Sequence, residues 1–211
     1  SQQSVDIALN KNVKVWSYTN QIGVSDGRRM QIASDLQSAI KNDELELYHQ
    51  PQVNLRTGEC NRAELLLRWK HKTYGYIGPD EFVAIAEDTG VINSLTKWVI
   101  NEAFRHHVEL QSKGYSDFNV SINLSVMDVI SDYFEEYLKS KLAEYKVSPN
   151  QITLEITETT SVSERLLLKN QLLSLRRIGF ALAIDDFGTG YSSLSYVSRL
   201  PLTELKVDRE F

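Results

Sequence analysis

The chain has 211 residues, of which 42% are hydrophobic and 24% charged, which is ordinary for one sizeable globular domain. Its formal net charge of −5 argues against binding to nucleic-acid polymers, because proteins that bind them usually carry a basic excess. Cys60 is the single cysteine, which excludes an internal disulfide and favours a cytoplasmic location. No apolar run reaches about 18 residues, so this segment is expected to make no membrane contact, although a longer parent protein could be membrane-anchored.

The beginning of the chain differs in pattern from the remainder. Residues 4–23 have the composition of a helix end followed by an extended segment, and they lack the features of a signal peptide. In residues 26–45 the apolar side chains recur with helical spacing, which predicts an amphipathic helix leading into the first strand.

Short apolar or β-branched runs then alternate with longer segments of helical spacing. The runs predict strands at residues 45–55, 62–69, 119–125, 151–158, 180–187 and 204–208. Two of the helical segments end at Gly114 and Gly179, which suit helix C-caps. This alternation predicts an α/β fold with a mainly parallel sheet, either an open doubly wound sheet or a (β/α)₈ barrel. The absence of a G-x-G-x-x-G sequence after the first strand weakens the dinucleotide-binding alternative.

Four of the predicted strands each carry one oxygen-bearing side chain near the carboxyl end, namely Glu64, Asn123, Glu155 and Asp185. In a parallel barrel these ends converge on one face, where active sites are found. Converging carboxylates repel one another unless a cation lies among them, and an all-oxygen set suits Mg²⁺, Mn²⁺ or Ca²⁺ rather than zinc. Lys206 on the last predicted strand could hold an attacking water or neutralise charge on a phosphate.

Simpler roles for these residues remain open. A single acid in a strand is more often part of a cross-strand ion pair, and Asp186 could merely form a turn with the glycines that follow it. Four such residues at successive strand ends favour a common site. The D-F-G sequence at residues 186–188 has none of the companion motifs of protein kinases, which excludes that class. His106 and His107 lie among charged residues and are predicted to be solvated.

Several motifs occur in a fixed order along the chain. They are YHQP (48–51), AELLLRW (63–69), YIGPDEFVAIAEDTGVI (76–92), NLS (123–125), LEITE (154–158), DDFGTGYSSL (185–194) and LKVD (205–208). On these residues the chain resembles the EAL domain family, phosphodiesterases that cleave the bacterial second messenger cyclic di-GMP. The match runs from about residue 33 to the last residue. Leu65 stands where the family usually has alanine, at a position expected to be apolar packing.

The resemblance implies a (β/α)₈ TIM-type barrel whose first strand is antiparallel to the others, with about six of the eight strands in this chain. It casts Glu64, Asn123, Glu155 and Asp185 as ligands of a catalytic divalent metal, and Asp186 as a ligand of a second metal. Lys206 would position the nucleophilic water. The implied catalytic set is therefore Lys206, Glu64, Asp185 and Asp186.

The resemblance also implies the substrate contacts and the reaction. Gln50, Leu66 and Arg68 match substrate-binding positions, and Arg68 suits a phosphate oxygen. The implied reaction is hydrolysis of cyclic di-GMP to the linear dinucleotide, with Mg²⁺ or Mn²⁺ as cofactor and Ca²⁺ inhibitory. The alternative is a catalytically inactive receptor for the same nucleotide. A homodimer is expected, with the loop at residues 188–193 coupling dimerisation to the site.

The resemblance further implies a domain arrangement. Residues 33–211 are predicted to form an EAL-type phosphodiesterase domain that lacks its C-terminal portion, because the family's later A-E-G-V-E strand is not found. Residues 1–32 are predicted to be a linker, or the tail of an upstream GGDEF-like or sensor domain. An incomplete barrel would leave two sheet edges exposed.

Overall fold

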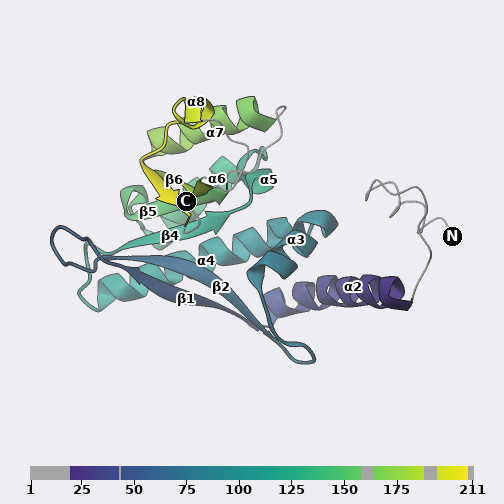
Figure 1. Cartoon of the computed structure of the whole chain (residues 1–211). Coiled ribbons are helices and arrows are strands. Elements are labelled where there is room, and N and C mark those ends of the chain that lie inside the picture. The colour runs from purple at the N-terminus through teal and green to yellow at the C-terminus, as the bar shows by residue number, and fades with distance from the viewer. Residues whose placement is uncertain (1–19, 43, 158–163, 188–193, 209–211) are drawn as a thin grey trace.

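The computed structural model of the chain describes residues 20–42, 44–157, 164–187 and 194–208 (Figure 1). The helices are α2 (Asn20–Lys41), α3 (Pro79–Thr89), α4 (Ile92–Ser112), α5 (Val126–Val129), α6 (Phe134–Tyr145), α7 (Glu164–Ile178) and α8 (Leu194–Val197), with a 3-10 helix η1 (Pro149–Gln151). The strands are β1 (Leu45–Gln52), β2 (Arg62–His71), β3 (Gly75–Ile77), β4 (Asn119–Leu124), β5 (Ile152–Thr157), β6 (Ala181–Phe187) and β7 (Glu204–Val207).

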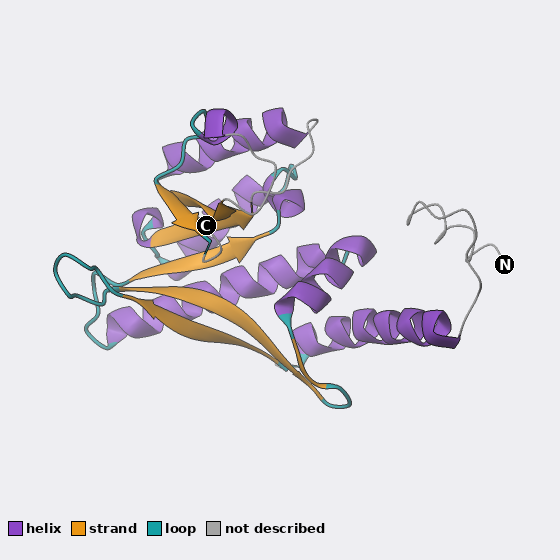
Figure 2. Cartoon of the chain, in the orientation of Figure 1, coloured by secondary structure: helices purple, strands orange, loops and turns teal. Residues whose placement is uncertain are grey.

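The strands form one mixed sheet (Figure 2). Their order is β1-β2-β4-β5-β6-β7, with β3 paired to the far end of β2. β1 is antiparallel to β2, whereas β2, β4, β5, β6 and β7 run parallel to one another. All six predicted strands are confirmed, and so is the expected α/β architecture of an incomplete TIM-like barrel. Sequence prediction missed β3, because three residues are too few to show a strand pattern.

The two faces of the sheet differ in polarity because successive side chains point to opposite sides. On one face, residues such as Ile122, Leu154 and Leu182 are buried in a large apolar cluster. Phe104 of α4 and Phe134 of α6 belong to the same cluster, so this face packs against helices. The polar residues of the strands therefore lie on the other face.

A second core lies where α2 and α3 meet the far end of β2 (Figure 1). Ile32 and Leu36 of α2 are fully buried there with Phe82 of α3 and Trp69 of β2. Ile32 and Leu36 are four residues apart and so share one side of α2, which confirms the predicted amphipathic helix.

The predicted helix-ending glycines are confirmed. Gly114 follows the end of α4 with φ of +94°, and Gly179 follows α7 with φ of +117°. A Cβ on Gly179 would also lie 3.1 Å from a side-chain carbon of Pro149. Both positions therefore favour glycine, which adopts positive φ without steric cost.

The prediction that His106 and His107 are solvated is wrong. The His107 side chain is fully buried, and its Nε2 lies 3.3 Å from Gln151 Oε1. The His106 side chain is only 18% exposed and stacks on His49 of β1, with ring centroids 5.0 Å apart. Charged neighbours in sequence misled the prediction, because α4 turns both imidazoles away from solvent while residues such as Arg105 stay on its outer side.

Some predictions fall outside the described residues. They include the first 19 residues of the segment 1–32 that was predicted to be a linker or a GGDEF-like tail, and the loop at residues 188–193. Among the helices that the structure describes, none combines the length and the apolar content needed to cross a bilayer.

Candidate active site

Glu64 lies where β2 changes its pairing partner. Residues 62–65 pair in parallel with β4, whereas residues 69–71 pair with β3. Glu64 is the third residue of a ten-residue strand, so the expectation that it stands near the carboxyl end is wrong. It is nevertheless the next-to-last residue of the segment 62–65 that pairs in parallel with β4. Beyond residue 65, β2 continues as an antiparallel ribbon with β1 and β3. This brings Glu64 level with the ends of the other parallel strands.

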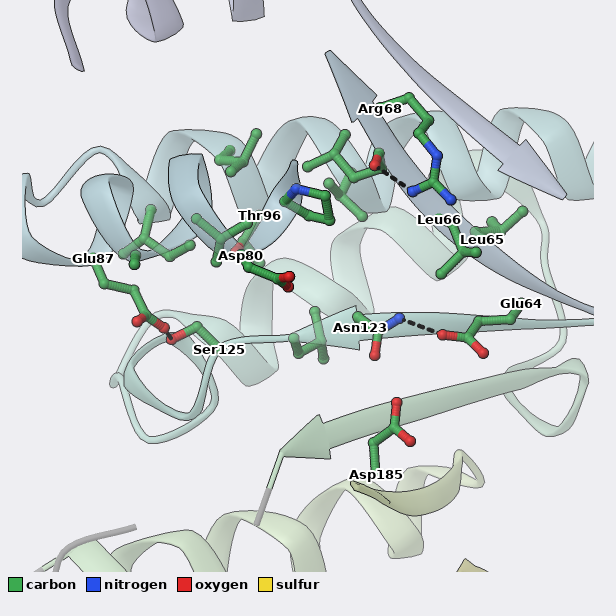
Figure 3. Close-up of a pocket in the computed structure, with 18 of the residues that line it drawn as sticks. Glu64, Leu65, Leu66, Arg68, Asp80, Glu87, Thr96, Asn123, Ser125 and Asp185 are labelled. Carbon is green, nitrogen blue, oxygen red and sulfur yellow. Dashed lines mark hydrogen bonds between the residues drawn. The ribbon is translucent and has the colours of Figure 1, made fainter. Parts of the chain in front are cut away.

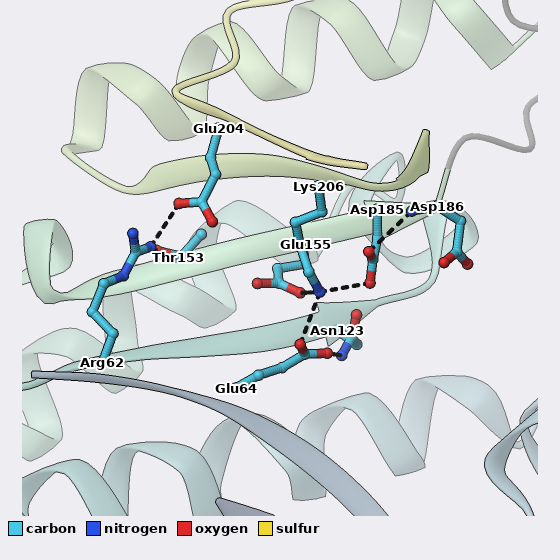
Figure 4. Close-up of polar contacts among 9 residues, drawn as sticks. All are labelled: Arg62, Glu64, Asn123, Thr153, Glu155, Asp185, Asp186, Glu204 and Lys206. Carbon is cyan, nitrogen blue, oxygen red and sulfur yellow. Dashed lines mark hydrogen bonds and ion pairs between the residues drawn. The ribbon is translucent and has the colours of Figure 1, made fainter. Parts of the chain in front are cut away.

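Side chains from four strands meet on the polar face of the sheet (Figure 4). Glu64 of β2, Glu155 of β5 and Asp185 of β6 each offer an oxygen atom, and these atoms lie within 4.8 Å of one another. The Nζ atom of Lys206 on β7 lies among them. It donates hydrogen bonds to Glu64 Oε2 at 2.8 Å, Glu155 Oε2 at 2.6 Å and Asp185 Oδ2 at 2.7 Å. We call these four residues the acid–lysine cluster.

Asn123 and Asp186 lie at the rim of this cluster. Asn123 Nδ2 donates a 2.8 Å hydrogen bond to Glu64 Oε1. Asp186 has a left-handed backbone with φ of +54°, and its N–H donates a 2.9 Å hydrogen bond to Asp185 Oδ1. The two adjacent aspartates thus present their carboxylates to different places (Figure 4). All five residues expected to bind metal are gathered at this end of the sheet.

Burial sets the protonation of the cluster. Burial raises the pKa of Glu155, which is fully buried, and the hydrogen bond from Lys206 opposes part of that rise. Burial alone would lower the pKa of Lys206, but its hydrogen bonds to Asp185, Glu155 and Glu64 outweigh that effect and raise it. Lys206 is therefore a firmly held ammonium group at neutral pH. Burial and the neighbouring Asp185 charge raise the pKa of Asp186.

The cluster fits a divalent metal ion. Three ionised carboxylates and one ammonium leave two negative charges, and Asp186 stands beside them. Glu155 Oε1 is buried and makes no hydrogen bond of normal geometry within the described part of the chain, although the nearby Ser121 hydroxyl lowers the Glu155 pKa. A buried carboxylate oxygen with so little hydrogen bonding is costly, and a cation would satisfy it. The all-oxygen donor set suits a hard cation such as Mg²⁺ or Mn²⁺.

The cluster stands at one end of a pocket of about 440 Å³ (Figure 3). Leu66 and Arg68 of β2 line the pocket, and α3 and α4 supply apolar walls that include Val83 and Leu95. The third substrate-binding candidate, Gln50, does not line it. Gln50 pairs directly with Glu64 across β1 and β2 and therefore stands on the same face of the sheet, beside the pocket.

Most of the chain shares one family's pattern. The EAL domain family model matches residues 33–211, which is most of the sequence. The chain belongs to the EAL domain family. Leu65, the departure from the family's naming motif, is 2% exposed within the apolar core, in agreement with its predicted packing role.

Several curated relatives share this EAL domain. The bifunctional diguanylate cyclase/cyclic di-GMP phosphodiesterase MucR of Pseudomonas aeruginosa is 34% identical over 92% of this chain and 28% of its own length. The cyclic di-GMP phosphodiesterase NbdA of the same species is 36% identical over 92% of this chain and 25% of its own. The oxygen sensor protein DosP of Escherichia coli is 34% identical over 87% of this chain and 23% of its own length. The chain thus spans about a quarter of the length of these relatives.

Solved EAL structures have the same fold. The MucR phosphodiesterase in complex with c-di-GMP superposes with a TM-score of 0.79 at 37% identity, covering 85% of this chain and 73% of that one. The EAL enzyme Bd1971, in its cAMP- and cyclic-di-GMP-bound form, has the same TM-score at 29% identity. The match covers 90% of this chain and 53% of the Bd1971 chain.

Two hydrogen-bond networks behind the EAL site were missed at the level of sequence. Ser125 lies two residues after Asn123 in the chain. Its Oγ donates a 2.7 Å hydrogen bond to Glu87 Oε1 of α3. The fully buried Asp128 accepts hydrogen bonds from Thr96 Oγ1 at 2.5 Å and from the Tyr133 hydroxyl at 2.7 Å. Both networks anchor the segment that follows Asn123. Asp128 lies within an apolar stretch of the sequence. A lone acidic residue in such a stretch was the signal that could have indicated a buried, hydrogen-bonded carboxylate.

Proposed function

We propose that this EAL domain hydrolyses cyclic di-GMP to the linear dinucleotide with a water activated by a divalent metal ion. The observation that carries the proposal is the convergence of Glu64, Glu155, Asp185 and Lys206 at the end of a pocket large enough for part of a nucleotide. Relatives named cyclic di-GMP phosphodiesterases and the c-di-GMP complex of MucR support the choice of substrate.

Mg²⁺ or Mn²⁺ is the proposed cofactor. Glu64, Asn123, Glu155 and Asp185 would hold a first ion, and Asp186 would contribute to a second beside it. Bound there, such an ion polarises a phosphoryl group and lowers the pKa of a coordinated water. Ca²⁺ is expected to fill the site and inhibit turnover, because its longer bonds and looser geometry position the reactants less well.

The side chains themselves bind and orient the substrate. Arg68 can grip a phosphate oxygen with its planar guanidinium, and Leu66 offers an apolar surface to the nucleoside. Gln50 would add a hydrogen bond from the neighbouring strand. Lys206 keeps its proton. A metal ion that bound the carboxylates would release the N–H groups of Lys206, which could then place the attacking water and offset negative charge on the phosphate.

The setting of the domain belongs to the same proposal. The long relatives, one of them a bifunctional cyclase, support an upstream GGDEF-like or sensor domain in the parent protein. A cytoplasmic location agrees with a cytosolic second messenger as substrate. A homodimer stays a prediction.

The test is conversion of cyclic di-GMP by the purified chain, followed by chromatography of the nucleotides. Product is expected with Mg²⁺ or Mn²⁺, none with a chelator, and at least a hundredfold less in Glu64→Gln, because the amide cannot replace a charged ligand. Lys72→Met is the matched control, since Lys72 is 78% exposed on the distant turn after β2. A folded wild type that leaves the nucleotide intact contradicts the proposal. Tight binding without turnover would identify a receptor instead.

A further inference from the structure

The face of β2 that carries the acid–lysine cluster continues well past the pocket. Glu64, Leu66, Arg68 and Lys70 are alternate residues and therefore stand on one side of the strand. At about 3.3 Å per residue, Leu66 and Arg68 stand about 7 and 13 Å along the strand from Glu64. That is the reach of a nucleotide from its phosphate to the far edge of its base.

Two tyrosines flank this row from the strands on either side. Tyr48 of β1 pairs with Leu66, and Tyr76 of β3 pairs with Lys70, so both rings stand on the face that carries Arg68. Leu66 and Lys70 lie on either side of Arg68 along β2, so the two tyrosines flank Arg68 from opposite sides.

Two cations lie against these rings. The Arg68 guanidinium carbon is 5.8 Å from the centroid of the Tyr48 ring, and Lys70 Nζ is 6.0 Å from that of Tyr76. Glu46, which pairs with Arg68, is the carboxylate on β1 at this level, so two positive charges face one negative charge. Tyr48 is 47% exposed and Tyr76 is 67% exposed, which leaves ring surface open to a ligand.

Exposed aromatic rings next to Arg and Lys are suited to nucleotides. Bases stack on aromatic and guanidinium planes, and cations beside them attract the phosphates. A phosphodiester held at the acid–lysine cluster would direct an attached base along β2 toward Arg68. The tyrosine rings lie where that base would arrive.

We propose that Tyr48 and Tyr76, together with Arg68 and Lys70, form a platform that binds one purine base of the cyclic dinucleotide substrate. The proposal rests on the proposed function and adds residues outside the expected substrate-binding set of Gln50, Leu66 and Arg68. It makes Tyr76, on a strand that the sequence did not predict, a determinant of substrate affinity.

The experiment measures cyclic di-GMP binding by calorimetry in Ca²⁺, and steady-state hydrolysis in Mg²⁺, for wild type and three variants. Tyr76→Ala is expected to weaken binding and raise KM about tenfold, the loss typical of removing one stacking ring. Its kcat is expected to change less than twofold, because the ring acts on binding rather than on the reacting phosphate. Tyr76→Phe keeps the ring and should bind within about twofold of wild type.

Tyr115→Ala is the matched control, because Tyr115 is 57% exposed but precedes β4 at the opposite end of the sheet. It is expected to bind like wild type. Tyr76→Ala binding as tightly as wild type overturns the platform while leaving the proposed function intact. A tenfold loss in Tyr115→Ala as well would also overturn it, since the effect would not be local. A folded wild type that neither binds nor cleaves cyclic di-GMP overturns the proposed function, and the platform with it.

Discussion

At the scale of single residues, Lys206 dominates the electrostatics of the site. Its three hydrogen bonds to carboxylates hold together side chains that would otherwise repel one another. Removing one partner from such a buried group of charges is far more costly than breaking a surface ion pair. Lys206 therefore stabilises the metal-free fold, and it would compete with a metal ion bound at the same oxygens.

Lys206→Met tests both effects. In chelator, the variant is expected to lose about 3 kcal/mol of unfolding free energy, because the carboxylates remain without their cation. Added Mg²⁺ should raise its melting temperature more than that of wild type, since no ammonium competes for the ligands. Thermal melts with and without Mg²⁺ provide the measurement. Equal stabilisation of the two proteins by Mg²⁺ would show that Lys206 and the metal do not share a site.

The buried histidines predict a loss of stability in acid. Burial lowers the pKa of the fully buried His107 and of the partly buried His106 in the folded protein, whereas a histidine in an unfolded chain titrates near pH 6.5. As the pH falls below about 6.5, the unfolded state takes up protons first, so the free energy of unfolding falls.

For one such group the slope reaches about 1.4 kcal/mol per pH unit. His107→Leu is expected to flatten the decline measured by urea titration between pH 7.5 and 5.5. The His107 imidazole is fully buried, so its removal should have a clear effect. An unchanged slope would mean that His107 is protonated alike in both states.

At the scale of elements, α3 is held between α2 and the pocket. Arg28 of α2 forms an ion pair with Glu81 of α3. A second ion pair joins Arg29 Nη2 to Asp88 Oδ2 at 2.6 Å. Residues such as Val83 on α3 line the pocket. These contacts link α2 to the helix that forms one wall of the pocket.

The predicted linker at residues 1–32 ends inside α2, and this boundary stays a prediction that Ile32 can test. Ile32→Ala is expected to reduce the unfolding free energy by about 3 kcal/mol, because a fully buried side chain would leave a cavity. Met30→Ala is the matched control on the same helix, since Met30 is 71% exposed and should change stability by less than about 0.5 kcal/mol. Chemical denaturation of both variants gives the comparison. Equal small effects would support a linker that is not part of the folded domain.

At the scale of the whole molecule, the sheet is open rather than closed. β1 and β7 are its two ends in the strand order, and Leu205 and Val207 of β7 are 40% and 57% exposed. A groove of about 350 Å³ lies beside β7, lined by residues that include Leu200 and Leu202. These features agree with an incomplete barrel, and the match covers 73% of the solved MucR chain.

The sequence by itself determined the local structure and the chemistry of the site. Alternation of apolar residues, helical spacing and the capping glycines are local signals, so six strands and the positions of Gly114 and Gly179 could be predicted. The oxygen-bearing residues carried by successive strands, Glu64 and Asp185 among them, indicated an oxygen-ligand metal site, although the position of Glu64 near the end of its strand was predicted wrongly. The order of the motifs identified the family.

Only the tertiary structure decided which side chains meet. The register between strands placed Lys206 at the centre of the carboxylates, put Gln50 on the face that carries Glu64, and set Tyr48 and Tyr76 on either side of Arg68. The packing of α4 buried His107 although its sequence neighbours are charged. Strand register and helix packing depend on residues more than a hundred positions apart, as between Glu64 and Lys206, and no local pattern carries that information.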